Sequence, residues 1–488
     1  MNAAVALLSW PEDAFEDWPL ALWTSAELAE ACGGIASGPF QVSGVEIDSR
    51  DVVEGDLFFA LKGETTDGHR FLEQAFARGA AAAVVDRKIA GNHILVDDVN
   101  AALERLGAAA RARIASTSVV LGVTGSVGKT SVKEALFAAL DRSSHGRAHR
   151  SVKSYNNHVG VPLSLARMPA GTRYGVFEMG MNHAGEIDAL TRQVRPHVAV
   201  ITTIAPAHIE NLGSEEAIAD AKAEIFRGLE PGGIAVIPAD SPHFARLRAA
   251  ALLVRAEVVS FGRSDQADVR LLDAVPAPGG GSLVTIDMGD RRLCYTVAAP
   301  GEHWVTNSLA VMAAVRAAGG DLGAAGLALG ELEGMKGRGA RHELALPGGG
   351  SALLIDESYN ANPASMAATL AQLGATAASR RIAVLGAMKE LGEQGPRFHA
   401  ELAGPLAGAG VDHVILVGDE MGALADELGK SRGGALGKAI PFAHCRDTAA
   451  AIAALADLGL ASGDAILVKG SNSVGLGKLV AALLDQEG

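Results

Sequence analysis

The sequence is poor in cysteine, in aromatic residues and in long apolar runs, and the few cysteines and short apolar runs narrow the class of protein. Its 488 residues include three cysteines, Cys32, Cys294 and Cys445, which lie far apart and form no CxxC or metal-ligand spacing. This sparse, odd set therefore suits a reducing cytoplasm better than a disulfide framework. Aromatic residues make up only 4% of the chain. No apolar run approaches the roughly 20 residues that a membrane-spanning helix needs.

Basic residues are also in the minority. The chain has 42 Lys and Arg against 56 Asp and Glu, a formal charge of −14 and a pI near 5.5. This balance argues against broad electrostatic binding to nucleic acid or to an anionic membrane, but it permits a local anion pocket. The apolar stretch 3–8 is short and lacks a preceding basic region, so we expect no secretory signal and a cytoplasmic protein. Residues 1–21 form a leader to which we assign no role.

Apolar residues are abundant, at 49% of the chain, and they alternate between strand-like and helix-like segments. The length suggests about three domains. Continuous apolar strands between helices are typical of parallel sheets covered on both faces. We therefore predict three α/β domains. A small N-terminal domain covers 1–98, a central domain with a parallel sheet covers 99–337, and a Rossmann-like domain covers 338–488.

Four local features accompany this division. We expect Ser25 to cap a helix over 26–31, because its hydroxyl can accept a hydrogen bond from the first turn. Strand-like runs 282–288 and 291–297 flank Gly289-Asp290, which predicts a hairpin. Helices are also expected over 215–229 and from Asn307 to 318.

The strongest chemical signal follows the apolar run 119–123, where a glycine-bearing loop opens a helix. Its glycines let backbone N–H groups turn toward phosphates, Lys129 brings a charge to the β and γ oxygens, and Thr130 can ligate Mg²⁺. The strict GxxxxGK[ST] template has glycine where this chain has Val123. The alternative interpretation is a chance glycine turn. The intact core predicts a nucleoside triphosphate site at Thr124, Gly125, Ser126, Val127, Gly128, Lys129 and Thr130.

Two residues that follow apolar strands suit a metal ion. Glu178 ends the strand around Val176, and His208 follows the strand that ends at Ile204. Because ligands bind at the carboxyl ends of parallel strands, both side chains can meet Mg²⁺ beside the phosphates. The alternatives are a solvent-facing glutamate and a structural histidine.

Lys222 interrupts an apolar stripe. On the expected helix, Ile218, Ile225 and Leu229 share its face by their i, i+3 and i+4 spacing. Burial lowers the pKa of a lysine, and a neutral amine can add carbon dioxide. The alternative is a lysine whose stem lies along the apolar surface while its amine reaches water.

The segment Gly122-Val-Thr-Gly-Ser-Val-Gly-Lys-Thr130 resembles the ATP loop of the Mur ligases and folylpolyglutamate synthases. Members of these families form amide bonds through acyl phosphates. The resemblance implies that the protein uses ATP and two Mg²⁺ ions, and that the lysine in the context Ala221-Lys-Ala-Glu-Ile225 is carbamylated. It implies catalytic or metal-binding roles for Thr130, Lys129, Glu178, His208 and Lys222.

Three further positions resemble nucleotide contacts of the Mur family. Pro300-Gly-Glu-His-Trp-Val-Thr-Asn307 resembles the family's PGxHNxxN segment, in which Trp304 replaces one asparagine and could stack on the adenine instead. Asn307 is retained, and its alternative role is a helix N-cap. Arg338 resembles the hinge arginine that reaches the phosphates; otherwise it is a linker arginine. Asp356 resembles the residue that holds the ribose.

Segments 156–162, 179–187 and 356–363 point to one branch of the Mur ligases, which joins D-alanyl-D-alanine to UDP-N-acetylmuramoyl-tripeptide. The resemblance implies substrate contacts at Ser49, Arg50 and Lys62 for the UDP-sugar end, and further at Asn156, Asn157, Asn182, His183, Tyr359, Asn360 and Asn362. Glu357 departs from the family's usual aspartate. We expect a monomer whose domains close over the acyl phosphate. A folylpolyglutamate synthase and a non-catalytic nucleotide-binding protein are the alternatives.

Overall fold

A computed structural model describes residues 21–63, 65–207, 209–277, 281–332, 334–430 and 439–485. The predicted leader, apart from its last residue, and His208 lie outside these ranges. The chain divides into two compact units, one of residues up to 118 together with 149–175, and one of 119–148 together with 176–488. The boundaries predicted at 98/99 and 337/338 stay predictions. Within the described ranges, no helix is both long and apolar enough to cross a bilayer.

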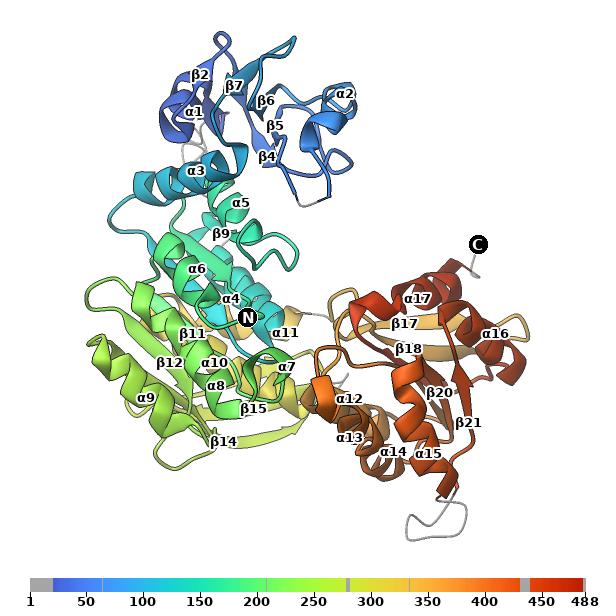
Figure 1. Cartoon of the computed structure of the whole chain (residues 1–488). Coiled ribbons are helices and arrows are strands. Elements are labelled where there is room, and N and C mark those ends of the chain that lie inside the picture. The colour runs from blue at the N-terminus through green and yellow to red at the C-terminus, as the bar shows by residue number, and fades with distance from the viewer. Residues whose placement is uncertain are drawn as a thin grey trace, which may run out of the picture. The chain divides into compact units, whose positions relative to one another are not determined.

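The first unit is built on a five-stranded sheet in the order β2-β7-β6-β5-β4 (Figure 1). Strands β4 to β7 run parallel, and β2 is antiparallel at the edge. Thr24, not the predicted Ser25, caps the first helix, because its side chain and Glu27 form a reciprocal capping box. The strands are β1 Trp23–Thr24, β2 Ile35–Ala36, β3 Gln41–Val42, β4 Gly44–Glu46, β5 Asp56–Phe59, β6 Ala82–Val85 and β7 His93–Leu95. The helices are α1 Ser25–Cys32, α2 Leu72–Ala77, α3 Val99–Arg113 and α5 Gly160–Ala166.

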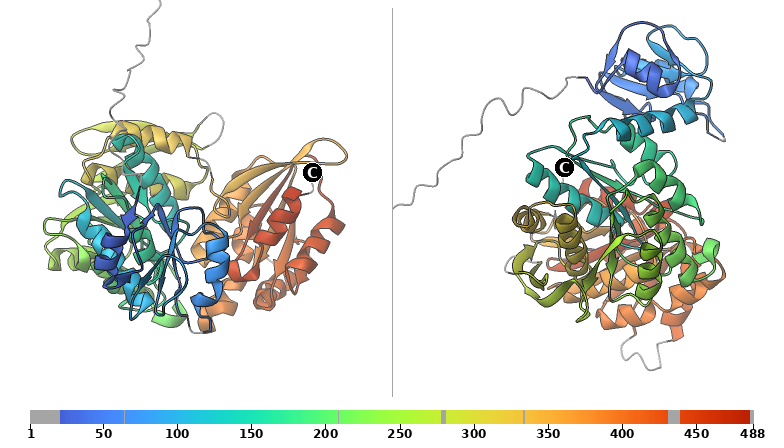
Figure 2. Two further views of the ribbon diagram at one scale, coloured as in Figure 1. Left: turned by 90° about the horizontal axis from the view of Figure 1, so that it is seen from above. Right: turned by 90° about the vertical axis from the view of Figure 1, so that its left-hand side faces the viewer.

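A nine-stranded sheet in the order β16-β15-β14-β13-β12-β11-β8-β10-β9 forms the central layer, with helices on both faces (Figure 1 and Figure 2). Strands β8, β11, β12, β13 and β14 run parallel, as the continuous apolar runs predicted. The predicted hairpin is confirmed as β15 paired antiparallel with β16. The strands are β8 Val119–Thr124, β9 Ala148–Arg150, β10 Tyr174–Glu178, β11 Val198–Ile201, β12 Ile234–Pro238, β13 Glu257–Gly262, β14 Val269–Pro276, β15 Ser282–Asp287 and β16 Arg292–Val297.

Two helices of this layer differ from their predicted bounds. The helix expected over 215–229 ends as α8 at Ala223 and continues as a 3-10 turn, Glu224–Gly228. The helix expected from Asn307 begins five residues earlier, at Glu302. The helices are α4 Lys129–Ser144, α6 Glu186–Val194, α7 Ile209–Leu212, α8 Glu215–Ala223, α9 Phe244–Leu253, α10 Glu302–Ala317 and α11 Leu322–Glu331.

The last third folds on a six-stranded sheet in the order β17-β18-β22-β19-β20-β21. All neighbours are parallel except the β17–β18 pair, so the Rossmann-like prediction is confirmed. The strands are β17 Ala340–Ala345, β18 Ser351–Glu357, β19 Arg380–Gly386, β20 His413–Val417, β21 Phe442–Cys445 and β22 Asp464–Lys469. The helices are α12 Pro363–Ala375, α13 Gly395–Ala400, α14 Ala403–Gly408, α15 Gly422–Lys430, α16 Thr448–Leu458 and α17 Gly477–Leu484.

Candidate active site

The loop between β8 and α4 has the geometry of a phosphate site. Gly125 has a φ of 150° and Gly128 a φ of 86°, angles that favour glycine. A Cβ added to Gly125 would lie 1.9 Å from Thr202 Oγ1, and one on Gly128 would lie 2.7 Å from Asn307 Oδ1. Both positions therefore require glycine, because their φ angles disfavour other residues and because a side chain would clash with close neighbours. Gly128 directly precedes α4, so the loop lies at the positive end of a 16-residue helix.

Hydrogen bonds to the segment that follows the neighbouring strand β11 hold this loop in place. Ser126 Oγ donates to the Ala205 carbonyl at 2.8 Å, and Thr202 Oγ1 donates to the Val127 carbonyl at 2.5 Å. Within the described ranges the buried Thr124 Oγ1 has no hydrogen-bond partner. A buried hydroxyl needs a partner, so this atom suits a polar ligand or an ordered water at the loop. Sequence reasoning missed Thr202, although a threonine just after a buried strand was a usable signal.

Lys129 lies under the loop. Its Nζ donates to the Gly125 carbonyl at 2.8 Å. Burial lowers the pKa of Lys129, the Glu178 carboxylate opposes that change, and the Arg338 charge adds to it. The Glu178 carboxylate therefore lies close enough to stabilise the charge of the Lys129 ammonium. Because water screens a partly buried charge less than an exposed one, Lys129 is well placed to neutralise a phosphate.

Thr130 and Glu178 bring two oxygen donors together. Thr130 Oγ1 donates to Glu178 Oε2 at 2.8 Å, and both residues are buried. Hydroxyl and carboxylate oxygens are ligands that Mg²⁺ prefers, so this pair fits that ion. In the part of the chain that the structure describes, no group of three His, Cys, Asp or Glu residues could hold a metal. The predicted ligand His208 lies outside that part, so its role stays a prediction.

Lys222 is buried on α8, with 1% of its surface exposed. The apolar stripe therefore predicted its burial correctly, and the lysine does not reach water. Burial lowers the pKa of Lys222 well below the usual lysine value, and the nearby charge of Lys129 lowers it further. Such a lysine favours the neutral amine that reacts with carbon dioxide.

The residues predicted to contact the adenine and the phosphates lie in different surroundings. Asn307 lies inside α10, so the N-cap alternative is wrong, and its side chain lies against Gly128 at the phosphate loop. Trp304 is 3% exposed and packs in the core, which leaves no open indole face for stacking. The Arg338 guanidinium lies 4.4 Å from the centre of the Tyr359 ring. Its charge acts on Lys129, which agrees with a position near the phosphates.

Asp356 organises the backbone around Arg338. Its Oδ2 accepts from the Gly337 N–H at 2.8 Å, and its Oδ1 accepts from the Ser358 hydroxyl at 2.6 Å. Only 1% of the residue is exposed. The carboxylate therefore already serves a local structural purpose, and its predicted contact with the ribose stays a prediction.

The predicted dipeptide residues lie where β18 ends. Tyr359 and Asn360 are exposed, as a ligand contact requires. Asn362 instead caps α12, where its Oδ1 accepts from the Ser365 N–H at 2.9 Å. Its Nδ2 also reaches the Ser126 carbonyl of the phosphate loop at 3.5 Å. Asn182 and His183 are exposed after β10, where Glu186 binds both of them.

In the first unit, the predicted UDP-sugar residues follow neighbouring parallel strands. Ser49 and Arg50 follow β4 and Lys62 follows β5, so all three lie at the carboxyl edge of the sheet. Ser49 Oγ donates to Gln74 Oε1 at 2.7 Å, while the exposed Arg50 binds Asp48. The hydrogen bond from Arg50 holds the pKa of Asp48 at about 2.

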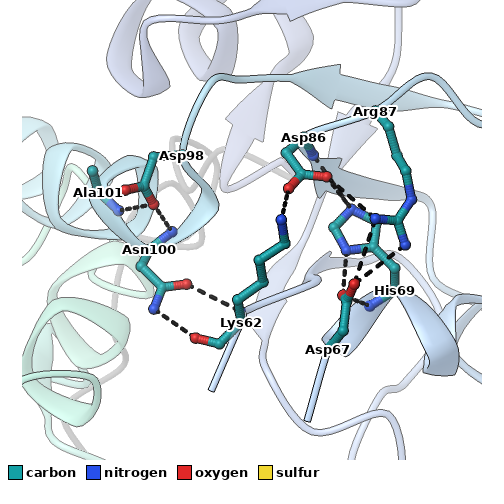
Figure 3. A network of polar contacts seen from close by, with 8 residues as sticks. All are labelled: Lys62, Asp67, His69, Asp86, Arg87, Asp98, Asn100 and Ala101. Carbon is teal, nitrogen blue, oxygen red and sulfur yellow. Dashed lines mark hydrogen bonds and ion pairs between the residues drawn. The ribbon is translucent and has the colours of Figure 1, made fainter. Parts of the chain in front are cut away.

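Figure 3 shows how the Lys62 side chain is held at this edge. Lys62 pairs with Asp86, which follows β6 and which sequence reasoning missed. The Asp86 N–H donates to His69 Nε2 at 3.3 Å, and His69 Nδ1 donates to Asp67 at 2.7 Å. Asn100 makes two hydrogen bonds with the Lys62 backbone, at 3.0 and 3.1 Å. Lys62 is thus an ordered cation at the edge where ligands bind.

The other predicted residues of this unit, Asn156 and Asn157, precede α5. Asn157 Oδ1 accepts from the N–H groups of Val159 and Gly160, at 3.2 and 2.8 Å, where that helix starts, while Asn156 is half-buried. Lys153 Nζ donates to Asp51 Oδ2 at 2.6 Å. This bond joins the loop that carries the two asparagines to the loop that carries Ser49 and Arg50.

Comparisons with known proteins agree with this geometry. Three family models match the chain: "Mur ligase family, catalytic domain" over 41–122, "Mur ligase middle domain" over 123–315 and "Mur ligase, glutamate ligase domain" over 343–472. The chain is 34% identical to the UDP-N-acetylmuramoyl-tripeptide–D-alanyl-D-alanine ligase of Synechocystis, over 92% of this chain and 93% of that protein.

Solved structures give the same result. A crystal structure of MurF from Acinetobacter baumannii aligns with a TM-score of 0.80 at 31% identity, over 96% of this chain and 100% of that one. The MurF ligase of Thermotoga maritima in complex with ADP aligns with a TM-score of 0.71 at 27% identity, over 92% of this chain and 99% of that one. With a phosphate loop, three α/β sheets and relatives that match nearly its whole length, this chain belongs to the Mur ligase family.

Proposed function

We propose that this protein uses ATP to join D-alanyl-D-alanine to UDP-N-acetylmuramoyl-tripeptide, with release of ADP and phosphate. The observation that carries the proposal is the phosphate loop with Lys129 and the adjacent Thr130–Glu178 pair, in a chain similar over 92% of its length to a ligase of that name. The ADP complex of the Thermotoga maritima relative supports the use of ATP.

The chemistry follows from the charges at the loop. The tripeptide carboxylate attacks the γ-phosphorus of ATP, which sets two anions together. Lys129 and the N–H groups at the start of α4 offset that repulsion as the phosphoryl group moves. The amine of the dipeptide then attacks the acyl carbon, and phosphate leaves with one of the former carboxylate oxygens. Mg²⁺, held by Thr130 and Glu178 and in our prediction also by His208, would add positive charge at the phosphates.

We also propose that Lys222 is carbamylated. Its burial and the charge of Lys129 favour the neutral amine, and the carbamate would supply an anionic oxygen ligand for a second Mg²⁺. A Lys222→Ala variant is expected to lose ligation and to recover part of it with added short-chain carboxylates, because these can occupy the vacated space. A Lys222→Ala variant with wild-type activity would contradict the carbamate proposal without touching the ligase proposal.

Each domain is proposed to serve one substrate. The N-terminal domain, with Lys62 and Arg50, would bind the UDP-sugar end, the central domain ATP, and the C-terminal domain the dipeptide. We place the boundaries near 98/99 and 337/338. A monomer in the cytoplasm is proposed too, and the three free cysteines support a reducing compartment.

Phosphate release from ATP, measured with each substrate omitted in turn, tests the function. We expect release only when UDP-N-acetylmuramoyl-tripeptide and D-alanyl-D-alanine are both present. ATP turnover that is indifferent to both would contradict the proposal. Turnover with a folate and glutamate would favour a folylpolyglutamate synthase. A Lys129→Ala variant that keeps full biological function would favour a non-catalytic nucleotide-binding protein.

A further inference from the structure

Lys469 carries its ammonium group inside the C-terminal domain. It is the last residue of β22 and is 2% exposed. Its Nζ donates to Glu357 Oε2 at 3.3 Å and to the Asn360 carbonyl at 2.9 Å. Burial of an ammonium costs free energy unless a counter-charge and hydrogen-bond acceptors compensate. Both partners of Lys469 come from one short segment, so the lysine ties that segment to the centre of the sheet.

The place of Lys469 in the sheet is where open α/β sheets bind ligands. Strand β22 lies between β18 and β19, with Lys469 in register with Glu357 on one side and Leu385 on the other. Outward from β22, the strands on one side are earlier and earlier in the chain (β18, β17), and those on the other side are later and later (β19, β20, β21). The strand order therefore reverses at β22, which makes it the switch point of the sheet. Ligands bind at the carboxyl ends of strands at such a point.

The segment that Lys469 holds is the exposed turn at Tyr359 and Asn360. The Tyr359 N–H donates to the Gly337 carbonyl at 3.1 Å, and the Arg338 guanidinium lies over the Tyr359 ring. The Asn360 carbonyl accepts from the Lys469 ammonium, and its side-chain Oδ1 accepts from the Ala361 N–H at 2.9 Å, although the residue as a whole is exposed. The same turn therefore connects the hinge at Arg338 with the switch point of the sheet.

We propose that Lys469 is a positioning residue for the incoming dipeptide. Together with Glu357 it fixes the backbone of the Tyr359–Asn360 turn, so that the exposed side chains of this turn are ordered before D-alanyl-D-alanine arrives. This inference rests on the proposed function, because it takes the dipeptide as the ligand of that turn. It assigns to Lys469 no contact with the reacting atoms.

A second ion pair on the same strand, with a buried carboxylate and a half-buried arginine, provides a control. Asp464 begins β22 and is 2% exposed, and Arg380 Nε donates to its Oδ1 at 3.1 Å. This pair lies at the amino edge of the sheet, away from the switch point. A general loss of stability from removing a buried charge would affect both pairs, whereas a loss of dipeptide positioning would affect only the Lys469 pair.

The test compares Lys469→Met with Asp464→Asn in the full-length enzyme. We expect Lys469→Met to raise the KM for D-alanyl-D-alanine by about tenfold or more, since a hydrogen-bonded charge anchors the turn, and to leave the KM values for ATP and UDP-N-acetylmuramoyl-tripeptide unchanged. Asp464→Asn should lower the melting temperature without changing the dipeptide KM. An unchanged dipeptide KM in Lys469→Met, or an equal rise of all three KM values, would overturn the inference.

Two further outcomes of this experiment also have a defined meaning. If Lys469→Met does not fold, Glu357→Gln, which keeps the shape of the partner and removes its charge, decides instead: a selective rise in the dipeptide KM supports the inference and no rise overturns it. A wild-type enzyme that joins no D-alanyl-D-alanine overturns the proposed function and this inference together. If the wild type ligates normally but the variants do not raise the KM for D-alanyl-D-alanine selectively, only this inference is overturned.

Discussion

Replacement of Gly125 by alanine is the sharpest test of the phosphate loop. At a φ of 150° the added Cβ would lie 1.9 Å from Thr202 Oγ1 and 3.1 Å from the Thr203 backbone nitrogen. Thr202 would have to rotate, which breaks its bonds to the carbonyls of Thr124 and Val127. Backbone strain costs about 1–3 kcal/mol and each lost hydrogen bond about 0.5–1.5 kcal/mol, or about 2–6 kcal/mol together.

A shift of the loop that relieves this contact would also move the backbone N–H groups that face the proposed phosphate site. Because about 1.4 kcal/mol corresponds to a factor of ten, we expect kcat/KM for ATP to fall at least tenfold in Gly125→Ala. Steady-state kinetics with ATP varied and binding of ADP without the other substrates both measure this loss. Gly404→Ala is the control, since Gly404 lies in α14 with no atom within 4 Å of the added Cβ. An ATP kcat/KM in Gly125→Ala equal to that of the wild type would refute the reasoning.

Two other predictions concern metal and pH. Glu178→Gln keeps a hydrogen-bond acceptor for Thr130 but loses the negative charge. We therefore expect kcat to fall by about 100-fold and the Mg²⁺ concentration for half-maximal rate to rise. An unchanged Mg²⁺ titration would argue against the metal site. Burial lowers the pKa of His149 in the folded protein to about 4, whereas the same histidine in the unfolded chain titrates near 6.5. Between pH 4 and pH 6.5 the unfolded chain therefore binds more protons than the folded protein. The melting temperature of the wild type should therefore fall more steeply from pH 6.5 to pH 4.5 than that of His149→Gln, and parallel curves would contradict this.

The sequence predicted best what depends on neighbours along the chain. The phosphate loop was found because strand, glycines, lysine and helix follow one another within 12 residues, from Val119 to Thr130. The burial of Lys222 was found because helical spacing shows which residues share a face. Helix ends were predicted less well: Thr24 and not Ser25 caps α1, since the reciprocal bond with Glu27 decides between two adjacent hydroxyls.

Contacts between distant segments could not be predicted from one sequence. The partner of Gly125 is Thr202, 77 positions away, and the partners of Lys469 are Glu357 and Asn360, more than 100 positions away. Such pairs arise from strand order, which no local pattern specifies. The Asp86 carboxylate beside Lys62 belongs to the same class, because only the β5–β6 pairing brings the ends of those strands together.

Transfer of oxygen from substrate to phosphate tests the central claim most directly. If an acyl phosphate forms at the Lys129 loop, a tripeptide labelled with ¹⁸O in its terminal carboxylate must pass one labelled oxygen to the phosphate released from ATP. Mass spectrometry of that phosphate, with D-alanyl-D-alanine present, is predicted to show one ¹⁸O atom for each peptide bond formed. Release of unlabelled phosphate alongside full ligation would contradict the proposed chemistry.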